Sequence, residues 1–246
     1  MSEVHVYGVV PAAADVELSE EKVRLIAHRD IAALVSDIDS QDLKAVRVLR
    51  RHWRVLEAVS TSTTVLPVRF GTVMASDEAV VEEFLEPSHD EIVATLADLA
   101  GKVQLTVKGV YQEDALMAGI VQGSPAIARL REEVRLMPEA AAYYKRIELG
   151  QRVAAEVERV RERDAHDVLE RLKPLALEAR LEPPSTADGA VNAAFLVEED
   201  RVAEFSDAVR ALSHELAGRI RLRYVGPLPP YSFTGDTATS GSSAWA

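Results

Sequence analysis

The chain has 246 residues, of which 48% are hydrophobic and 28% charged, a composition that is typical of a folded globular protein and excludes a disordered one. Its formal net charge of −12 argues against a nucleic-acid-binding surface over the whole chain, although a local basic stripe remains compatible with it. The absence of cysteine excludes disulfides, thiolate nucleophiles and zinc–thiolate sites.

Three strands are expected at the start of the chain. Residues 4–10 are almost entirely apolar, which predicts a buried strand. Residues 22–28 and 31–38 have the composition of two further strands, and the short turn between them predicts a hairpin.

A helix is predicted from a cap at Ser40 to about Ser60. Its apolar stripe consists of Leu43, Val46, Leu49, Trp53, Leu56 and Ser60, at steps of three and four. Trp53 lies at the centre of this stripe, so we expect it to be buried and its truncation to alanine to cost roughly 3–5 kcal/mol.

The same helix carries a dense basic patch on an otherwise acidic chain. The patch consists of Lys44, Arg47, Arg50, Arg51 and Arg54, all lying off the apolar stripe. Two interpretations remain open, a solvated helix face paired with nearby acids and a docking surface for an acidic partner. For the second, the candidate partner-binding residues are Lys44, Arg47, Arg51 and Arg54.

The least generic stretch is Val-Leu-Pro-Val-Arg-Phe-Gly-Thr-Val at residues 65–73, whose composition predicts a strand. Pro67 cannot donate a hydrogen bond to a ladder, so this strand should be short, lie at an edge or begin at the proline. Gly71 predicts a sharp turn. Arg69 should point away from its two neighbours, and we expect it to be more than half buried and bonded to a carboxylate or to backbone carbonyls. A ligand contact is the alternative role.

Two helices and a strand are predicted next. Ser76 is expected to cap the first helix, and Pro87 to end it. The capping box at 88–91 opens the second helix, which Gly101 closes. Residues 103–108 alternate between apolar and polar, which predicts a strand with one wet face. The order βββαβαβ predicts a ferredoxin-like sheet with an extra strand.

The middle of the chain is predicted to be helical. Ser124 and Pro125 start one helix, and residues 139–178 form the longest helical stretch. The apolar stripe of this stretch averages about 3.7 residues per step, close to the eleven-residue repeat of a coiled coil. Asp164 interrupts the stripe, and Pro174 should kink or end the helix. We expect this helix to project, or to pack against the preceding helix as a two-helix arm.

The last regular elements form a smaller strand–helix–strand unit. Residues 191–197 predict a central strand, and Asp200 is expected to cap the helix that follows. Apolar residues then alternate with Arg219, Arg221 and Arg223. We expect this arginine row to meet acids of the long helix or of the N-terminal domain.

The C-terminal stretch has an unusual composition. Residues 226–233 hold three prolines and two aromatic residues, which predicts an extended, polyproline-like segment held in place by the aromatic rings. Residues 234–246 are rich in serine, threonine, glycine and alanine and predict a disordered tail.

The fold class expected from these elements is α+β. A ferredoxin-like N-terminal domain of order βββαβαβ covers residues 1–123, and a C-terminal α+β domain with a long coiled-coil-like helix and a small βαβ unit covers 124–233. The tail, 234–246, lies outside both domains.

Two blocks of this sequence resemble signatures of the gas vesicle protein F/L family (GvpF/GvpL). The first block, which resembles LPxRFGT, contains Leu66, Pro67, Arg69, Phe70, Gly71 and Thr72. The second, which resembles Y-x-GP-x-PPY-x-F, contains Tyr224, Gly226, Pro227, Pro229, Pro230, Tyr231 and Phe233. Residues 143–150 and 192–197 also resemble family blocks, and His52 stands where members often have a histidine. Val68 and Leu228 replace a methionine and a tryptophan that are usual in the family.

The resemblance extends over about residues 4–233 and implies a function. Members of the family are accessory or minor structural proteins of gas vesicles, the protein-walled, gas-filled organelles that give some bacteria and archaea buoyancy. The resemblance implies the ferredoxin-like N-terminal domain and the coiled-coil-like helical part, a location in the cytoplasm and at the gas vesicle, and two kinds of partner. These are the small, hydrophobic major shell protein, which is bound during nucleation and formation, and other gas vesicle accessory proteins.

The residues themselves favour an interaction protein over an enzyme. The two blocks consist of proline, glycine and aromatic residues with one arginine and no acid–base pair, so we expect an architectural role for them. The six histidines are scattered without metal-ligand spacing, and neither a phosphate-binding glycine loop nor a nucleophile elbow is present. We therefore expect no catalytic site, no cofactor and no metal, and neither a nucleic-acid partner nor a membrane span. The N-terminus predicts no signal peptide.

Two alternatives remain beside a shell-protein binder. An enzyme or a small-molecule-binding regulator could use the same ferredoxin-like fold, and the regulator would show a defined polar pocket. A shell-protein binder would instead show an apolar groove or a free strand edge. We expect residues 1–123 to carry shell-protein binding, and the competing hypothesis is that the long helix is the docking arm.

Overall fold

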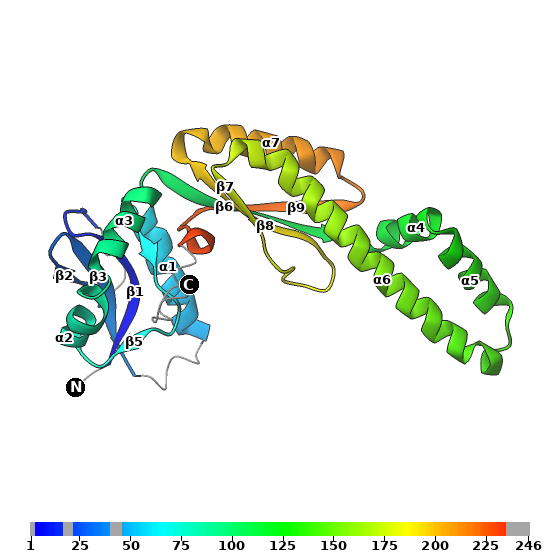
Figure 1. The fold of residues 1–246 in the computed structure, drawn as a ribbon, viewed down its shortest axis with the longest axis horizontal. Coiled ribbons are helices and arrows are strands. Elements are labelled where there is room, and N and C mark those ends of the chain that lie inside the picture. The colour runs from blue at the N-terminus through cyan, green and yellow to red at the C-terminus, as the bar shows by residue number, and fades with distance from the viewer. Residues whose placement is uncertain (1–2, 17–21, 40–45, 235–246) are drawn as a thin grey trace. The chain divides into compact units, whose positions relative to one another are not determined.

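The computed structural model describes residues 3–16, 22–39 and 46–234, and these form two compact units (Figure 1). Contacts assign Met1–Gln104, Leu196–Glu199 and Gly226–Ala246 to an N-terminal unit, and Leu105–Phe195 and Asp200–Val225 to a C-terminal unit. Ser40, Lys44 and the predicted tail beyond Thr234 lie outside the described residues.

The unit boundary differs from the predicted one after residue 123. The chain leaves the N-terminal unit at Gln104, inside strand β6 (Lys102–Tyr111), and returns to it at Gly226. The strand is continuous, so no linker composition marks this boundary in the sequence. The alternating pattern of a strand also does not indicate which sheet the strand joins.

The N-terminal unit is built on an antiparallel sheet in the order β2-β3-β1-β4, with β5 also paired to β1. Its strands are β1 (Glu3–Pro11), β2 (Arg24–His28), β3 (Ile31–Ile38), β4 (Leu66–Pro67) and β5 (Val73–Met74). The register of β1 and β3 runs from Glu3 opposite Ile38 to Pro11 opposite Ile31. The predicted hairpin of β2 and β3 is confirmed.

Helices cover this sheet, and β1 and β3 are buried along nearly their whole length. The helices are α1 (Val46–Ser60), α2 (Asp77–Ala79), the π-helix η2 (Val80–Leu85) and α3 (His89–Leu99). Helix α1 packs on the face that carries Tyr7 and Leu34, while α3 packs against β1 and β3. The predicted cap is confirmed at α2, where the amide of Ala79 donates to the Ser76 hydroxyl at 3.2 Å.

Gly8 allows α1 and β4 to approach β1. A Cβ atom at this position would lie 2.8 Å from Leu56 Cδ2 and 2.8 Å from the backbone oxygen of Leu66. A larger residue would therefore require the helix or the strand to move.

The C-terminal unit is built on the sheet β7-β8-β6-β9. Its further strands are β7 (Glu178–Leu181), β8 (Gly189–Glu198) and β9 (Ile220–Leu228), and its helices are α4 (Glu113–Gly123), α5 (Pro125–Leu136), α6 (Glu139–Leu172) and α7 (Val202–Glu215). Short turns of helix follow at η3 (Lys173–Leu175), η4 (Glu199–Arg201) and η5 (Tyr231–Phe233).

The predicted ferredoxin-like N-terminal domain is not found. Residues 103–108 belong to β6, which pairs with β8 and β9 rather than with β1. The order of a ferredoxin-like sheet appears instead in the C-terminal unit. Along the chain, β6, β7, β8 and β9 alternate with helices as βαββαβ. In the sheet they lie in the order β7-β8-β6-β9, so the second strand of the unit is followed by its third, first and fourth. The sequence pattern does not predict β7, and without β7 this order cannot be recognised.

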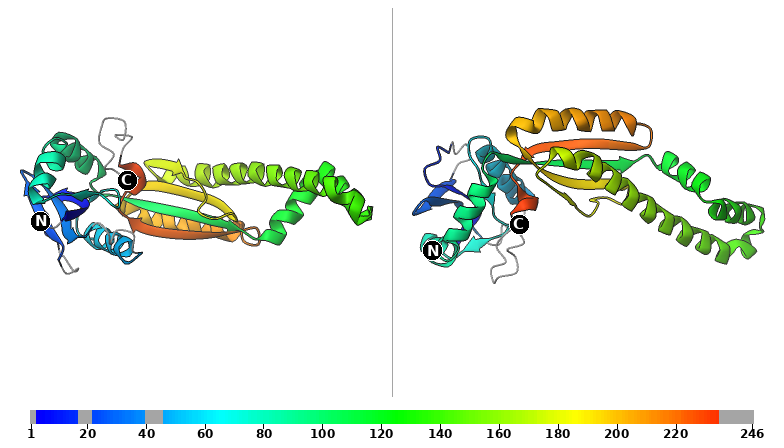
Figure 2. Two further views of the ribbon diagram at one scale, coloured as in Figure 1. Left: turned by 90° about the horizontal axis from the view of Figure 1, so that it is seen from below. Right: turned by 45° about the horizontal axis from the view of Figure 1, so that its top comes forward.

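The helical arm of the C-terminal unit agrees with the prediction. Helix α5 begins at Pro125, and the amide of Ile127 donates to the Ser124 hydroxyl at 3.4 Å. Helix α6 ends at Leu172, just before the turn that contains Pro174. The first half of α6 extends beyond the sheet and packs against α5 (Figure 2). None of the helices in the described residues combines the length and apolar character of a membrane span.

Candidate functional site

The first signature block forms two short strands on β1 rather than the single predicted strand. Leu66 and Pro67 form β4, Val73 begins β5, and the chain turns between them. Backbone hydrogen bonds hold the block to β1. The amide of Val68 donates to the carbonyl oxygen of Tyr7 (2.9 Å), and the amide of Val6 donates to the carbonyl oxygen of Thr72 (3.0 Å). The short strand predicted at Pro67 is confirmed, as is the turn at Gly71, whose φ is +91°.

Arg69 belongs to the exposed residues and lies outside the regular strands, so the prediction that it is more than half buried and bonded to a carboxylate or to backbone carbonyls stays a prediction. It lies in the turn between β4 and β5, where the amide and the hydroxyl of Thr72 donate to its carbonyl oxygen at 3.2 and 2.9 Å. Because the backbone turns here, the strand alternation that predicted an inward arginine does not apply.

Helix α1 is rotated relative to the prediction. Its buried residues are His52, Val55, Leu56 and Val59. Within the described residues of the predicted stripe, only Leu56 is buried, and Trp53 is 44% exposed. Residues 52, 55, 56 and 59 also follow helical spacing. Because residue 52 is a histidine, the apolar pattern of the sequence does not indicate that this face is the buried one.

A buried histidine pair explains why His52 faces inward. His5 Nε2 and His52 Nδ1 are 3.0 Å apart, and the two side chains are 0% and 1% exposed. Burial, and then the charge of Arg51, lowers the pKa of His5 to about 4. Burial, and then His5, lowers the pKa of His52 to about 3, although a hydrogen bond with the backbone of Val68 acts in the opposite direction. Both imidazoles are therefore neutral at pH 7.

The histidine pair lies against the first signature block. The Phe70 ring contacts both imidazoles, with centroids 5.7 Å from His5 and 5.4 Å from His52. Sequence reasoning missed this pair because its members are far apart in the chain. Within the described residues, no group of three or more histidine, aspartate or glutamate side chains could hold a metal ion.

A pocket of about 380 Å³ opens between α1 and the end of β3. It is lined by Tyr7, Ser36, Asp37, Ile38, Asp39, Arg47, Val48, Arg51 and Arg54. We call it the basic pocket. The structure thus brings three of the predicted partner-binding residues to one pocket, while the fourth, Lys44, lies outside the described residues. The buried hydroxyls of Tyr7 and Ser36 are hydrogen-bonded at 2.8 Å.

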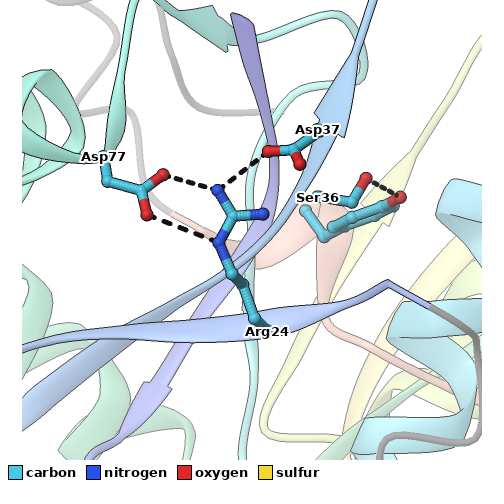
Figure 3. A network of polar contacts seen from close by, with 5 residues as sticks. Arg24, Ser36, Asp37 and Asp77 are labelled. Carbon is cyan, nitrogen blue, oxygen red and sulfur yellow. Dashed lines mark hydrogen bonds and ion pairs between the residues drawn. The ribbon is translucent and has the colours of Figure 1, made fainter. Parts of the chain in front are cut away.

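One of the two acids of the pocket also belongs to a further ion pair. Figure 3 shows Arg24 between the carboxylates of Asp77 and Asp37, close to Ser36. Arg24 Nη2 lies 2.5 Å from Asp77 Oδ1 and 2.9 Å from Asp37 Oδ1. The negative charge of Asp37 is thereby shared with a residue outside the pocket.

Helix α1 is basic on an acidic chain. Residues 46–60 contain four arginines and one glutamate, a net charge of +3. Guanidinium groups bind carboxylates with two parallel hydrogen bonds, so the pocket has the chemistry to accept an acidic side chain.

An exposed apolar stripe on α1 follows the basic residues. It consists of Val46 (63% exposed), Leu49 (37%) and Trp53 (44%), at steps of three and four along the helix. We call it the α1 stripe. Arg47 and Arg54 each directly follow a member of the stripe in sequence, so basic groups border it along the helix. An apolar surface with a charged border is typical of a protein interface.

The second signature block ends in the N-terminal unit. The Tyr231 ring lies on Trp53 with centroids 4.5 Å apart, and it packs against the cluster that contains Val55 and Val65. Pro229, Pro230 and Phe233 are buried, and the amide of Ser232 donates to Gln104 Oε1 at 2.8 Å. The aromatic residues thus hold this segment in place.

The earlier part of this block is regular, contrary to the prediction. Gly226, Pro227 and Leu228 continue β9, and the peptide between Gly226 and Pro227 is cis. Pro227 is tolerated because β9 is an edge strand of its sheet. Tyr224 lies in the same strand, and its hydroxyl is 3.3 Å from that of Ser206 on α7.

The C-terminal unit contains its own buried polar cluster. Asp164 is 4% exposed, and its Oδ2 accepts from the Tyr111 hydroxyl (2.7 Å) and pairs with Arg219 (2.5 Å). Burial, and then the bond to Asp164, raises the pKa of Tyr111. The prediction that the arginine row meets the long helix is confirmed for Arg219, and this cluster joins α6 to β6 and to the start of β9.

Comparison with known proteins places these features in a family context. The family model described as gas vesicle synthesis protein GvpL/GvpF matches residues 3–235. Gas vesicle protein F of Streptomyces sp. (strain CB03234) is 34% identical over 216 residues, which cover 87% of this chain and 88% of that protein. Gas vesicle protein L of the same organism is 30% identical over 257 residues, covering 93% and 88%. The crystal structure of GvpF from Anabaena sp. PCC7120 matches with a TM-score of 0.78 at 26% identity, covering 96% of this chain and 99% of that one.

Proposed function

Because this chain belongs to the gas vesicle synthesis protein GvpL/GvpF family and has a role in gas vesicles, we propose that it binds the hydrophobic major shell protein during gas vesicle nucleation and formation. The family is one of gas vesicle proteins and is not known as an enzyme family. In this proposal the protein acts in the cytoplasm at the forming vesicle, where it also meets other accessory proteins.

The observation that carries the proposal is the combination of the α1 stripe and the basic pocket on one helix. A hydrophobic shell subunit must be kept from aggregating before it joins the wall, and covering part of its apolar surface achieves this. Val46, Leu49 and Trp53 supply exposed apolar surface for that purpose. The pocket arginines supply a site for an acidic side chain of the subunit.

The two parts of this surface have different tasks. Charged groups at a border chiefly increase the association rate and orient the partner, whereas desolvated apolar contacts slow dissociation. We therefore assign orientation to Arg47, Arg51 and Arg54 and retention to the α1 stripe.

The packing of α1 supports a rigid binding surface. Val55, Leu56 and Val59 fix its inner side on the sheet, and Tyr231 contacts Trp53 from the second signature block. A preorganised surface loses less entropy on binding than a mobile one. In this proposal both signature blocks have an architectural role, which is supported by the contact of Phe70 in the first block with the histidine pair beneath α1.

The test is a kinetic binding measurement with the full chain and immobilised major shell protein. The variant Arg47→Glu/Arg51→Glu/Arg54→Glu should associate at least tenfold more slowly at low salt, with a weaker salt dependence than the wild type. Leu49→Ala/Trp53→Ala should instead dissociate faster at a nearly unchanged association rate.

The matched control reverses three exposed arginines of the C-terminal unit, Arg210, Arg221 and Arg223, which gives the same change in net charge. This control should associate within about twofold of the wild type. Melting curves of all variants confirm that each is folded. Equal slowing of the two charge-reversed variants would show a general charge effect and contradict the proposed site. Unchanged binding of the α1 variant would also contradict it.

A further inference from the structure

The first half of α6 has an exposed side without any charge. Its members are Tyr143, Tyr144, Ile147, Gly150, Gln151, Ala154 and Ala155, all of them exposed. We call this set the neutral face. It extends over about 18 Å of a helix that is otherwise densely charged.

The neutral face points away from the rest of its own unit. The opposite side of α6 carries Leu149, Val153 and Val157, which pack with α4 and α5 around Ile120 and Ile127. Tyr143 and Tyr144, by contrast, are 61% and 81% exposed. Large apolar side chains gathered on one exposed helix face mark an interaction surface.

The sizes of the side chains on this face are unequally distributed along the helix. The large residues Tyr143, Tyr144 and Ile147 occupy its first half. Its second half carries the small residues Gly150, Ala154 and Ala155, with Gln151 as its one larger side chain. A helix face with large side chains at one end and small side chains at the other is complementary to a second copy of itself that runs in the opposite direction.

An antiparallel two-fold pairing centred near residue 149 matches these halves. Tyr144 of one copy then faces Ala154 of the other, and Tyr143 faces Ala155. The positions 144, 147, 151 and 154 are separated by three and four residues, which is the spacing of a helix–helix seam. A parallel pairing would instead place tyrosine against tyrosine and alanine against alanine, with crowding at one end and voids at the other.

The nearest charges lie at the border of the neutral face. Glu148 and Arg152 form an ion pair of 2.8 Å, and both line a hollow with Arg129 and Glu133 of α5. The orientation of the pairing therefore follows from the sizes of the side chains on the neutral face.

We propose that this protein forms an antiparallel two-fold dimer through the neutral face of α6, with Gly150 close to the axis. A helical face of this length buries roughly 800–1,000 Å² in total, which is below the size of a typical stable interface. The dimer is therefore weak and forms with rising protein concentration. The proposal depends only on the C-terminal unit and needs no shell protein, so it stands or fails independently of the proposed function.

Sedimentation equilibrium of the full chain between roughly 1 and 200 µM tests the proposal. The wild type should shift from monomer to dimer across this range. Ala154→Arg, which places a long charged side chain where Tyr144 of the second copy packs, should raise the dissociation constant at least tenfold. Ala203→Arg makes the same change at an exposed alanine of α7 and should leave the constant within about twofold. A monomer at every concentration would overturn the proposal, as would an unchanged constant for Ala154→Arg.

Disulfide trapping tests the orientation, because the natural chain has no cysteine. Mixing Tyr144→Cys with Ala154→Cys under mild oxidation should yield mainly the mixed disulfide. Two copies of residue 144 would lie about 15 Å apart along the seam, too far for a bond. Predominant formation of the Tyr144→Cys homodimer would show a parallel arrangement and overturn the proposal.

Discussion

The two units bury polar groups in different ways. In the N-terminal unit, His5 and His52 are enclosed beneath α1 as a neutral pair whose pKa values are both lowered. In the C-terminal unit, Asp164 is buried with an arginine partner that remains 44% exposed. Burying the neutral histidine pair costs little as long as neither imidazole is protonated. Burying a carboxylate costs little only as long as its cation and its hydrogen-bond donor are present. The units should therefore fail under different perturbations.

The largest expected effect is acid destabilisation of the N-terminal unit. Below pH 6.5 the unfolded chain binds protons at both histidines that the folded chain excludes until about pH 4 and 3. Stability consequently falls as the pH drops through this window, by about 4 kcal/mol for the two groups together at pH 5. Urea unfolding at pH 7.5 and 5.0, followed by Trp53 fluorescence in a Trp245→Phe background, measures the loss.

The histidine assignment has its own control. His5→Gln/His52→Gln retains polar side chains of similar size that do not titrate. This variant should be less stable at neutral pH but show a flatter dependence between pH 6.5 and 5. A pH dependence as steep as that of the wild type would assign the effect to other groups.

Next in size is the loss of the buried carboxylate in the C-terminal unit. Asp164→Ala leaves the Tyr111 hydroxyl and Arg219 without their acceptor, and we expect it to cost about 2–3 kcal/mol. Asp207→Ala breaks the exposed pair with Arg210 and should cost less than about 0.5 kcal/mol. Chemical unfolding followed by circular dichroism compares the two. Equal losses would show that the Asp164 cluster is not a stabilising contact.

The glycines at close approaches provide a smaller contrast between the units. A Cβ atom on Gly8 would meet the rigid backbone oxygen of Leu66 at 2.8 Å, whereas one on Gly109 would meet side-chain atoms, the nearest being Val191 Cγ1 at 2.7 Å. Side chains relax more easily than backbone, so Gly8→Ala should cost about 2 kcal/mol and Gly109→Ala about 1 kcal/mol. Melting temperatures of the two variants test this order, and the reverse order would contradict it.

The smallest expected effect concerns Trp53. Since this side chain is 44% exposed, Trp53→Ala should cost about 1 kcal/mol rather than the 3–5 kcal/mol expected for a buried tryptophan. Leu56→Ala, at a fully buried position of the same helix, should cost about 2–5 kcal/mol and serves as the reference. If urea unfolding shows equal losses for the two variants, the outer side of α1 is part of the core.

Local signals in the sequence predicted many elements correctly. The strand at residues 31–38 and the helix start at Ser124 and Pro125 follow from composition and capping, which act over a few residues. The turn at Gly71 follows from the conformational freedom of glycine. The α+β class and the helical arm follow from the sum of such signals.

The predictions that were wrong depend on contacts between residues that are far apart in the sequence. The pattern of residues 103–108 indicated a strand but not the sheet that it joins, so the ferredoxin-like order was assigned to the wrong unit. The inner side of α1 depends on His52, which is polar in a pattern search but neutral beside His5. The single strand predicted over residues 65–73 is interrupted by a turn at Arg69, and short-range composition does not show where a strand turns. At the candidate site, the spacing of the sequence predicted that three arginines lie together on one helix. It did not predict that the end of β3 forms the other wall of the pocket.

The most direct test of shell-protein binding by α1 is site-specific photo-crosslinking in the full chain. A benzoylphenylalanine replaces Leu49 on the α1 stripe or Tyr144 on the neutral face of α6, and each protein is irradiated with and without the purified major shell protein. We expect an adduct with the shell protein from position 49 and an adduct between two copies of this chain from position 144. A shell-protein adduct from position 144 and none from position 49 would show that the helical arm is the docking surface and would contradict shell-protein binding by α1.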